Sequence, residues 1–308
     1  MSQINQPKMK ILNGRTSGGD WQVSVNPCSM RIISSLARPL LFAAISAASI
    51  LVLLRQGHAE MSGWAENEGG RMRLVVLPPD AAGHIRAGLQ IEPKPGWITY
   101  WREPGNNGIP PQITIAPQSG VTLDAISYPV PKRIFSGKVE DIGYAAAVTL
   151  PLSLTSWKAG PVVIDATAFI GICKDICIPF QAHFSLSLGA AAQSRPQEQT
   201  ILQSAAACLP EAPSADFGVV AHAMSADLKQ LSLKVTLPEA GNGTPEIIVT
   251  GPSGYAFTKQ MNVGRSGRAY SADIAIGKLP SNYDIKGKQW GVLVVDGARA
   301  METTLAFD

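Results

Sequence analysis

Phe169-Ile-Gly-Ile-Cys-Lys-Asp-Ile-Cys-Ile-Pro-Phe180 places two cysteines four residues apart in a segment rich in strand-forming residues. A straight β-strand would hold Cys173 and Cys177 about 13 Å apart. A hairpin turn at Lys174–Ile176 would instead bring them face to face at roughly 4.5–5.5 Å between Cα atoms, a separation that a disulfide tolerates. The stretch therefore predicts two antiparallel strands that meet at a cysteine pair able to open and close.

Segments before and after this stretch alternate between apolar and polar residues with a period of two. This alternation predicts half-buried strands, and clusters such as Glu103–Gly108 and Lys158–Pro161 predict the turns between them. Seven or more short strands at this spacing favour an immunoglobulin-like sandwich. The predicted strands are His84–Glu92, Trp97–Trp101, Gln112–Ile115, Val121–Ile126, Ala145–Leu150, Val162–Phe169 and Gln181–Leu188.

The pattern stops at residues 190–215, which predicts a linker. Ala190–Gln199 is small and polar, and Thr200–Cys208 has the composition of a short helix. Beyond it the alternation returns and predicts a second set of strands, at Leu231–Leu237, Glu246–Thr250, Tyr270–Ile276, Trp290–Val295 and Ala298–Phe307. We therefore expect an all-β chain with two immunoglobulin-like sandwiches, at residues 60–189 and 216–308.

The N-terminal region has the layout of an export signal. Leu40–Leu54 is an unbroken run of apolar and small residues, preceded by Arg31 and Arg38 and followed by Gly57–Ala59. The run is shorter than the roughly 20 residues that span a bilayer, so cleavage is favoured over an uncleaved anchor. We expect residues 1–59 to be a signal peptide with an overlong N-terminus, and the exported chain to have no stable membrane insertion.

Removal of this leader changes the charge of the chain. Residues 1–59 hold six of the 26 Lys and Arg and one of the 23 Asp and Glu, which leaves 20 basic and 22 acidic residues and a net charge of about −2. Such a balance argues against nucleic-acid binding. With 45% hydrophobic and 16% charged residues, the chain can bury a core without disulfides.

Three stretches occur in an order typical of one family. They are Trp97-Ile-Thr-Tyr-Trp-Arg-Glu-Pro-Gly-Asn-Asn-Gly-Ile-Pro110, then Tyr128-Pro-Val-Pro-Lys-Arg-Ile-Phe-Ser-Gly-Lys138 leading to Gly143-Tyr144, and then Cys173-Lys-Asp-Ile-Cys-Ile-Pro179. The series resembles the N-terminal periplasmic domain of the thiol:disulfide interchange protein DsbD. It is more similar still to the ScsB-type relatives among the copper-sensitivity suppressor proteins.

The resemblance implies a periplasmic protein in which Cys173 and Cys177 are the redox pair, with no cofactor beyond their disulfide. The partners that it implies are a membrane electron-transfer protein and thioredoxin-like periplasmic proteins. Phe135 falls where the family has a cap-loop aromatic that shields the disulfide, and Tyr100 falls near an aromatic that lines it. The acidic residues before the cap aromatic in DsbD are replaced here by Pro131–Arg133.

The chain ends at Asp308 without a membrane-embedded or a thioredoxin-like domain. We therefore expect it to be one link of an electron relay, with the other links supplied by separate proteins.

Two other functions fit a pair of exported cysteines. The pair could be an inert structural disulfide in a binding or assembly module, or its two thiolates could bind Cu(I) in a copper-tolerance protein. His183 offers no further ligand, because its alternation with Ser185 and Ser187 places it on the solvent face, and we predict no metal site. The sequence does not say which cysteine forms a mixed disulfide and which resolves it.

Cys208 is the only other cysteine outside the leader. We expect it to be a buried thiol on the linker helix, although an odd cysteine in an exported chain can also link two molecules.

Overall fold

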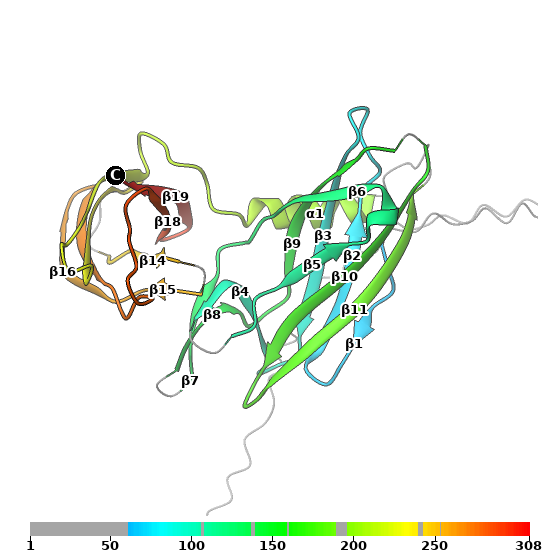
Figure 1. Cartoon of the computed structure of the whole chain (residues 1–308), viewed down its shortest axis with the longest axis horizontal. Coiled ribbons are helices and arrows are strands. Elements are labelled where there is room, and N and C mark those ends of the chain that lie inside the picture. The colour runs from blue at the N-terminus through cyan, green and yellow to red at the C-terminus, as the bar shows by residue number, and fades with distance from the viewer. Residues whose placement is uncertain are drawn as a thin grey trace, which may run out of the picture. The chain divides into compact units, whose positions relative to one another are not determined.

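The computed structural model describes residues 61–105, 108–136, 139–158, 160–188, 196–239, 243–252 and 254–308. Its regular structure consists of strands β1–β19, one short 3-10 helix and one α-helix, which confirms the prediction of an all-β chain (Figure 1). The predicted leader lies outside the described residues. Within them, no helix has the length and hydrophobicity needed to cross a membrane.

The first sandwich consists of two antiparallel sheets. One sheet has the order β1 (Ala65–Glu66), β2 (Gly70–Val76), β3 (His84–Pro93), β9 (Val148–Ser156) and β6 (Val121–Ile126). The other has the order β11 (Cys177–Leu188), β10 (Val162–Cys173), β4 (Ile98–Gly105), β8 (Val139–Tyr144) and β7 (Lys132–Ser136), while β5 (Gln112–Ile115) also pairs with β10.

Alternate side chains of both sheets form the core of this sandwich. Leu150, Leu152 and Leu154 of β9 are buried, as are Ile164 and Ile170 of β10, because residues two apart in a strand share a face. The alternation leaves the opposite face of each sheet free for other contacts. The cysteine pair and the residues around it lie on that outer face of the β10-containing sheet.

Helix α1 (Pro196–Ala207) lies in the predicted linker and packs on the outer face of the other sheet. Leu202 contacts Val75 and Leu77 there. Proline suits the first turn of a helix, where the missing N–H would have no partner, so the helix begins earlier than the predicted Thr200.

The expectation that Cys208 is buried is wrong, because its side chain is exposed. Leu202 and Ala205 define the packed side of α1, and the helix ends at Ala207 before Cys208 could join that side.

The second sandwich has two four-stranded antiparallel sheets. One has the order β12 (Gly218–Met224), β13 (Gln230–Thr236), β17 (Ala269–Ala275) and β16 (Gln260–Ser266). The other has the order β15 (Ala256–Phe257), β14 (Glu246–Thr250), β18 (Lys288–Asp296) and β19 (Arg299–Phe307). Their core includes Trp290, whose ring stacks on Phe257 with 5.7 Å between centroids.

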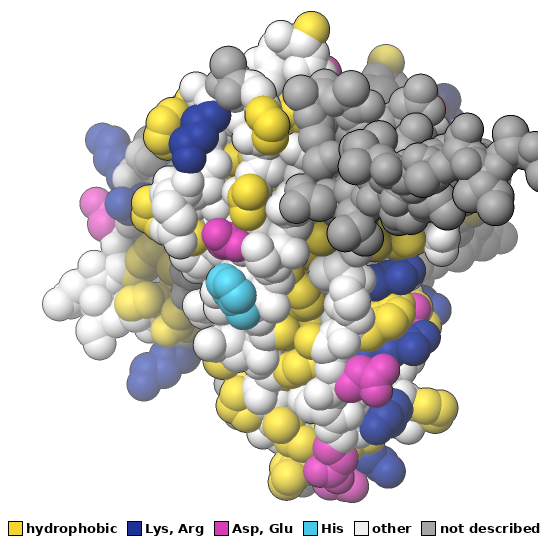
Figure 2. Space-filling model, turned by 90° about the vertical axis from the view of Figure 1, so that its right-hand side faces the viewer, with side chains coloured by type: hydrophobic (Ala, Val, Ile, Leu, Met, Phe, Trp, Pro, Cys, Tyr) yellow, Lys and Arg dark blue, Asp and Glu magenta, His cyan; other side chains and the backbone are white. Residues whose placement is uncertain are grey.

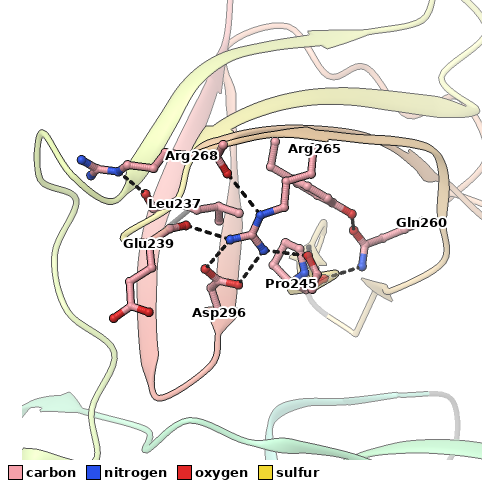
Figure 3. Close-up of polar contacts among 10 residues, drawn as sticks. Leu237, Glu239, Pro245, Gln260, Arg265, Arg268 and Asp296 are labelled. Atoms are coloured by element: carbon pink, nitrogen blue, oxygen red, sulfur yellow. Dashed lines mark hydrogen bonds and ion pairs between the residues drawn. The ribbon is translucent and has the colours of Figure 1, made fainter. Parts of the chain in front are cut away.

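A single arginine anchors a turn of the second sandwich. Arg265 donates to the carbonyl oxygens of Glu239 and Gly243 at 2.8 and 2.6 Å, and it pairs with the carboxylate of Asp296 (Figure 3). The Arg265 side chain is 10% exposed, so these contacts satisfy a nearly buried charge. We read this network as structural.

One face of the molecule carries side chains of both charges. Figure 2 shows basic and acidic side chains interspersed among apolar ones on that face, without a continuous basic surface. This distribution agrees with the near-neutral charge that remains when the leader is left out.

Candidate functional site at the tip of the cysteine hairpin

Strands β10 and β11 form a long hairpin that ends at the two cysteines (Figure 1). They pair continuously from Val162 with Leu188 to Cys173 with Cys177. Lys174 N donates to the carbonyl oxygen of Ile176 at 3.1 Å and closes the predicted turn. The two cysteines form a disulfide, with 4.1 Å between their Cα atoms.

The two sulfur-bearing residues differ in exposure. Cys173 is 3% exposed, whereas Cys177 is exposed to solvent, and the neighbouring Ile176 is 68% exposed. An attacking thiolate must reach a sulfur along the line of the S–S bond. Cys177 is therefore the more accessible residue of the pair, and Cys173 is buried.

Tyr100 lies beside the disulfide. Cys173 pairs with Ile98 of β4, so Tyr100, two residues further along that strand, points to the same face. Its side chain is 2% exposed and its Oη lies 3.3 Å from Cys177 Sγ. Burial, assisted by the charge of Asp141, raises the pKa of Tyr100 to about 12. The hydroxyl therefore keeps its proton at neutral pH and can donate it to a sulfur anion.

Two glycines hold the Tyr100 ring in place. A Cβ at Gly108 would lie 2.6 Å from Cδ1 of the ring, and a Cβ at Gly171 would lie 3.2 Å from its Cδ2 and 2.7 Å from Ile109 Cβ. The backbone of both glycines thus packs directly against the ring. This packing fixes the ring so that its hydroxyl stays within hydrogen-bond distance of Cys177 Sγ.

Phe135 occupies the edge strand β7, opposite Glu140 of β8. Ile134 is paired with Asp141 and shares its face of the sheet. Because side chains alternate along a strand, Phe135 points to the opposite face. Its ring is 63% exposed and lies 5.2 Å from the guanidinium of Arg133. The shielding role of Phe135 stays a prediction.

Asp141 is a residue of this site that the sequence reading passed over. It is 7% exposed, and among the described residues its Oδ1 has no hydrogen-bond partner. Burial raises the pKa of this carboxyl group. Asp141 falls between Lys138 and Gly143, where the sequence predicts no strand, so no local pattern marked it.

The structure does not bring His183 to the cysteine pair. His183 lies six residues along β11 from Cys177, which is about 20 Å in an extended strand. Its ring instead contacts Thr167 Oγ1 at 3.3 Å. Among the described residues, no group of three or more His, Cys, Asp or Glu side chains is arranged to hold a metal ion.

The substitution Tyr100→Phe tests the hydroxyl alone. We expect the thiol pKa of Cys177 in the reduced protein to rise by about 1–2 units, because the thiolate loses a hydrogen bond from a neutral donor. The measurement is the rate of alkylation of Cys177 against pH, with mass mapping of the modified peptide. Tyr270→Phe, which removes a hydroxyl bonded to Gln260 in the second sandwich, is the control. Identical profiles for Tyr100→Phe and the control would contradict the assignment.

Comparisons with known proteins agree with the resemblance seen in the motifs. Residues 74–188 match the family described as the N-terminal domain of the thiol:disulfide interchange protein DsbD. The chain is also similar to the crystal structure of the N-terminal periplasmic domain of ScsB from Proteus mirabilis. The TM-score is 0.64 with 21% sequence identity, over 81% of this chain and 99% of that chain. No curated protein matches the chain.

Proposed function

Given that residues 74–188 form a domain of the DsbD N-terminal type, we propose that this chain is a thiol:disulfide interchange protein that carries reducing equivalents on Cys173 and Cys177. The observation that carries the proposal is an exposed cysteine, Cys177, at the tip of a hairpin, with its sulfur 3.3 Å from a buried tyrosine hydroxyl. A preorganised donor beside a disulfide serves exchange, because it stabilises a thiolate.

The contribution of the disulfide to stability favours exchange over a purely structural role. It closes a loop of five residues between strands that are already paired, so its effect on the unfolded chain is about 2 kcal/mol at most. The strands of the sandwich bury a large apolar core that does not involve the disulfide. A bond that the fold does not need is free to be broken in a catalytic cycle.

When the pair is reduced, the difference in exposure determines which cysteine is attacked. A partner's thiolate attacks Cys177 Sγ, the Cys173–Cys177 bond breaks, and Cys173 leaves as a thiolate that takes up a proton. The partner's second cysteine then attacks the sulfur of the partner's first cysteine, which is bonded to Cys177 in the mixed disulfide. This step forms the partner's disulfide and releases Cys177 as a thiolate. The partner thereby gives up two electrons to the pair.

Delivery to a client is the same chemistry in reverse. The Cys177 thiolate attacks a client disulfide, forms a mixed disulfide and releases a client thiolate, which takes up a proton. Cys173 loses its proton and attacks Cys177 Sγ, which restores the disulfide and frees the second client thiol. We propose thioredoxin-like proteins and a membrane electron-transfer protein as the partners, and the periplasm as the compartment.

A redox titration against glutathione tests the proposal. We expect the pair to equilibrate with the buffer at a potential above about −300 mV, the value below which structural disulfides usually lie. Alkylation followed by mass analysis reports the reduced fraction. The titration uses a Cys208→Ser background, because the exposed thiol of Cys208 would itself form mixed disulfides with glutathione. A pair that stays oxidised at every glutathione ratio would support the inert binding module instead.

A further inference from the structure

Asp141 shares a face of the β10-containing sheet with the exchange site. It lies two residues from Gly143 on β8, and Gly143 is paired with Tyr100 of β4. Residues two apart in a strand are about 7 Å apart and point to the same side. The carboxyl group of Asp141 therefore lies on the same side of the sheet as the Tyr100 ring, whose hydroxyl contacts Cys177.

Gly105 and Gly108 flank the exchange site on the β4 side. Gly105, the last residue of β4, pairs with Asp141. A Cβ at Gly108 would lie 2.3 Å from Pro104 Cβ and 2.6 Å from the Tyr100 ring, so the backbone of Gly108 packs against both. Asp141 is 7% exposed, although it belongs to the strand next to an edge of the sheet.

No described cation neutralises this carboxyl group through a hydrogen bond or ion pair. Lys132 of β7 lies on the same face of the sheet as Asp141. It is paired with Gly143, two residues along β8 from Asp141, and its side chain is exposed. Arg133 points to the other face, where it pairs with Glu140. Asp141 is paired with the apolar Ile134 of β7, and the nearest titratable group of the exchange site is Tyr100 on the neighbouring strand β4. The cysteine pair lies beyond Tyr100, on the next two strands of the sheet, β10 and β11.

We propose that Asp141 is a positioning residue for thiol–disulfide exchange, whose buried negative charge opposes formation of the Cys177 thiolate in the reduced protein. This inference rests on the proposed function and deepens it. Asp141 and the Tyr100 hydroxyl act in opposite directions on the same sulfur. The hydroxyl stabilises the thiolate by donating a hydrogen bond, and the carboxylate destabilises it by like-charge repulsion.

The balance has a chemical consequence for a carrier. Attack on a client requires the thiolate, and its fraction at a given pH is set by the thiol pKa. By raising that pKa, Asp141 keeps the reduced pair mostly protonated between encounters. It thereby limits reaction with disulfides that do not dock at the site.

The test compares Asp141→Asn with Glu140→Gln, both in a Cys208→Ser background. The first variant removes the charge and keeps the shape, and the second removes a charge from the adjacent residue on the other face of the strand. The reduced proteins are alkylated over a range of pH, and mass mapping follows Cys177. We expect Asp141→Asn to lower the thiol pKa of Cys177 by about one unit and to speed its alkylation near neutral pH several-fold. Glu140→Gln is expected to leave the profile unchanged.

A second measurement checks that the carboxyl group of Asp141 is buried and titrates in the folded protein. Because burial raises the folded-state pKa of Asp141, the folded protein holds this proton more tightly than the unfolded chain. The stabilising effect is complete below the unfolded pKa and is lost as pH rises through the folded pKa. The unfolding midpoint of the wild type should therefore fall over that window relative to Asp141→Asn.

The outcomes separate this inference from the proposed function. Equal Cys177 profiles in the wild type and Asp141→Asn would overturn the role of Asp141, even if the protein exchanges disulfides with its partners. A shifted profile supports that role even if the glutathione titration finds an inert disulfide, because alkylation requires no partner. A shift of the same size in Glu140→Gln would also overturn it, since a general change in surface charge would then suffice.

Discussion

Replacement of Cys173 by alanine is expected to leave Cys177 able to form a mixed disulfide that the protein itself cannot resolve. Cys177 is exposed, whereas Cys173 is 3% exposed and lies behind it. When reduced Cys173→Ala meets an oxidised thioredoxin-like protein, a covalent complex should accumulate. In Cys177→Ala the remaining thiol is buried, so the complex should be absent. Non-reducing electrophoresis and mass mapping of the linked peptides provide the measurement.

Both variants should lose the complete two-electron exchange, because that reaction needs both sulfur atoms. The free thiol of Cys208 is exposed and could form a complex of its own, so each variant is made together with Cys208→Ser. Trapping through Cys173 would reverse the assigned roles. Trapping with neither variant would remove the support for exchange with thioredoxin-like partners.

Gly143→Ala is expected to destabilise the first sandwich by about 3 kcal/mol. A Cβ at this position would lie 2.1 Å from the carbonyl oxygen of Thr99 and 3.0 Å from Tyr100 Cα. Both atoms belong to the backbone of β4, and Thr99 is fully buried, so no flexible side chain can move aside. The clash must separate β4 from β8. Urea unfolding of the two proteins measures the loss.

Gly63→Ala is the matched control, because a Cβ there meets no heavy atom within 4 Å. An alanine in open space reduces the entropy of the unfolded chain and should be neutral or slightly stabilising. Only Gly143→Ala should therefore lower the free energy of unfolding. Equal unfolding free energies for Gly143→Ala and the wild type would show that β4 and β8 are less closely packed than the structure describes.

The strands that the sequence predicted best have a clear alternation and a turn on each side. Gln112–Ile115 and Val121–Ile126 coincide with β5 and β6. Ala145–Leu150 was placed too early, since β9 begins at Val148 and continues through Pro151 to Ser156. Three alanines extended the apolar pattern beyond the residues that are buried. Propensity and periodicity cannot tell a small exposed residue from a small buried one.

The hairpin of β7 and β8 was not predicted from the sequence. Lys132 and Arg133 make β7 look like a polar loop, yet charged side chains are common on edge strands, which they protect from further pairing. Here β7 is held as a strand by its backbone pairing with β8. Since Asp141 lies on β8, missing this hairpin also meant missing the buried carboxyl group.

The sequence alone determined the all-β class, the hairpin at Lys174–Ile176 and the identity of the cysteine pair, because period-two alternation, turn residues and motif order act over a few neighbouring residues. Only the tertiary structure decided which sulfur faces solvent and which side chains surround it. Tyr100 and Asp141 come from β4 and β8, far from the hairpin in the chain, and strand register brings them to one face of the sheet. Burial by a distant segment then sets the pKa of both groups, and no local pattern encodes that burial.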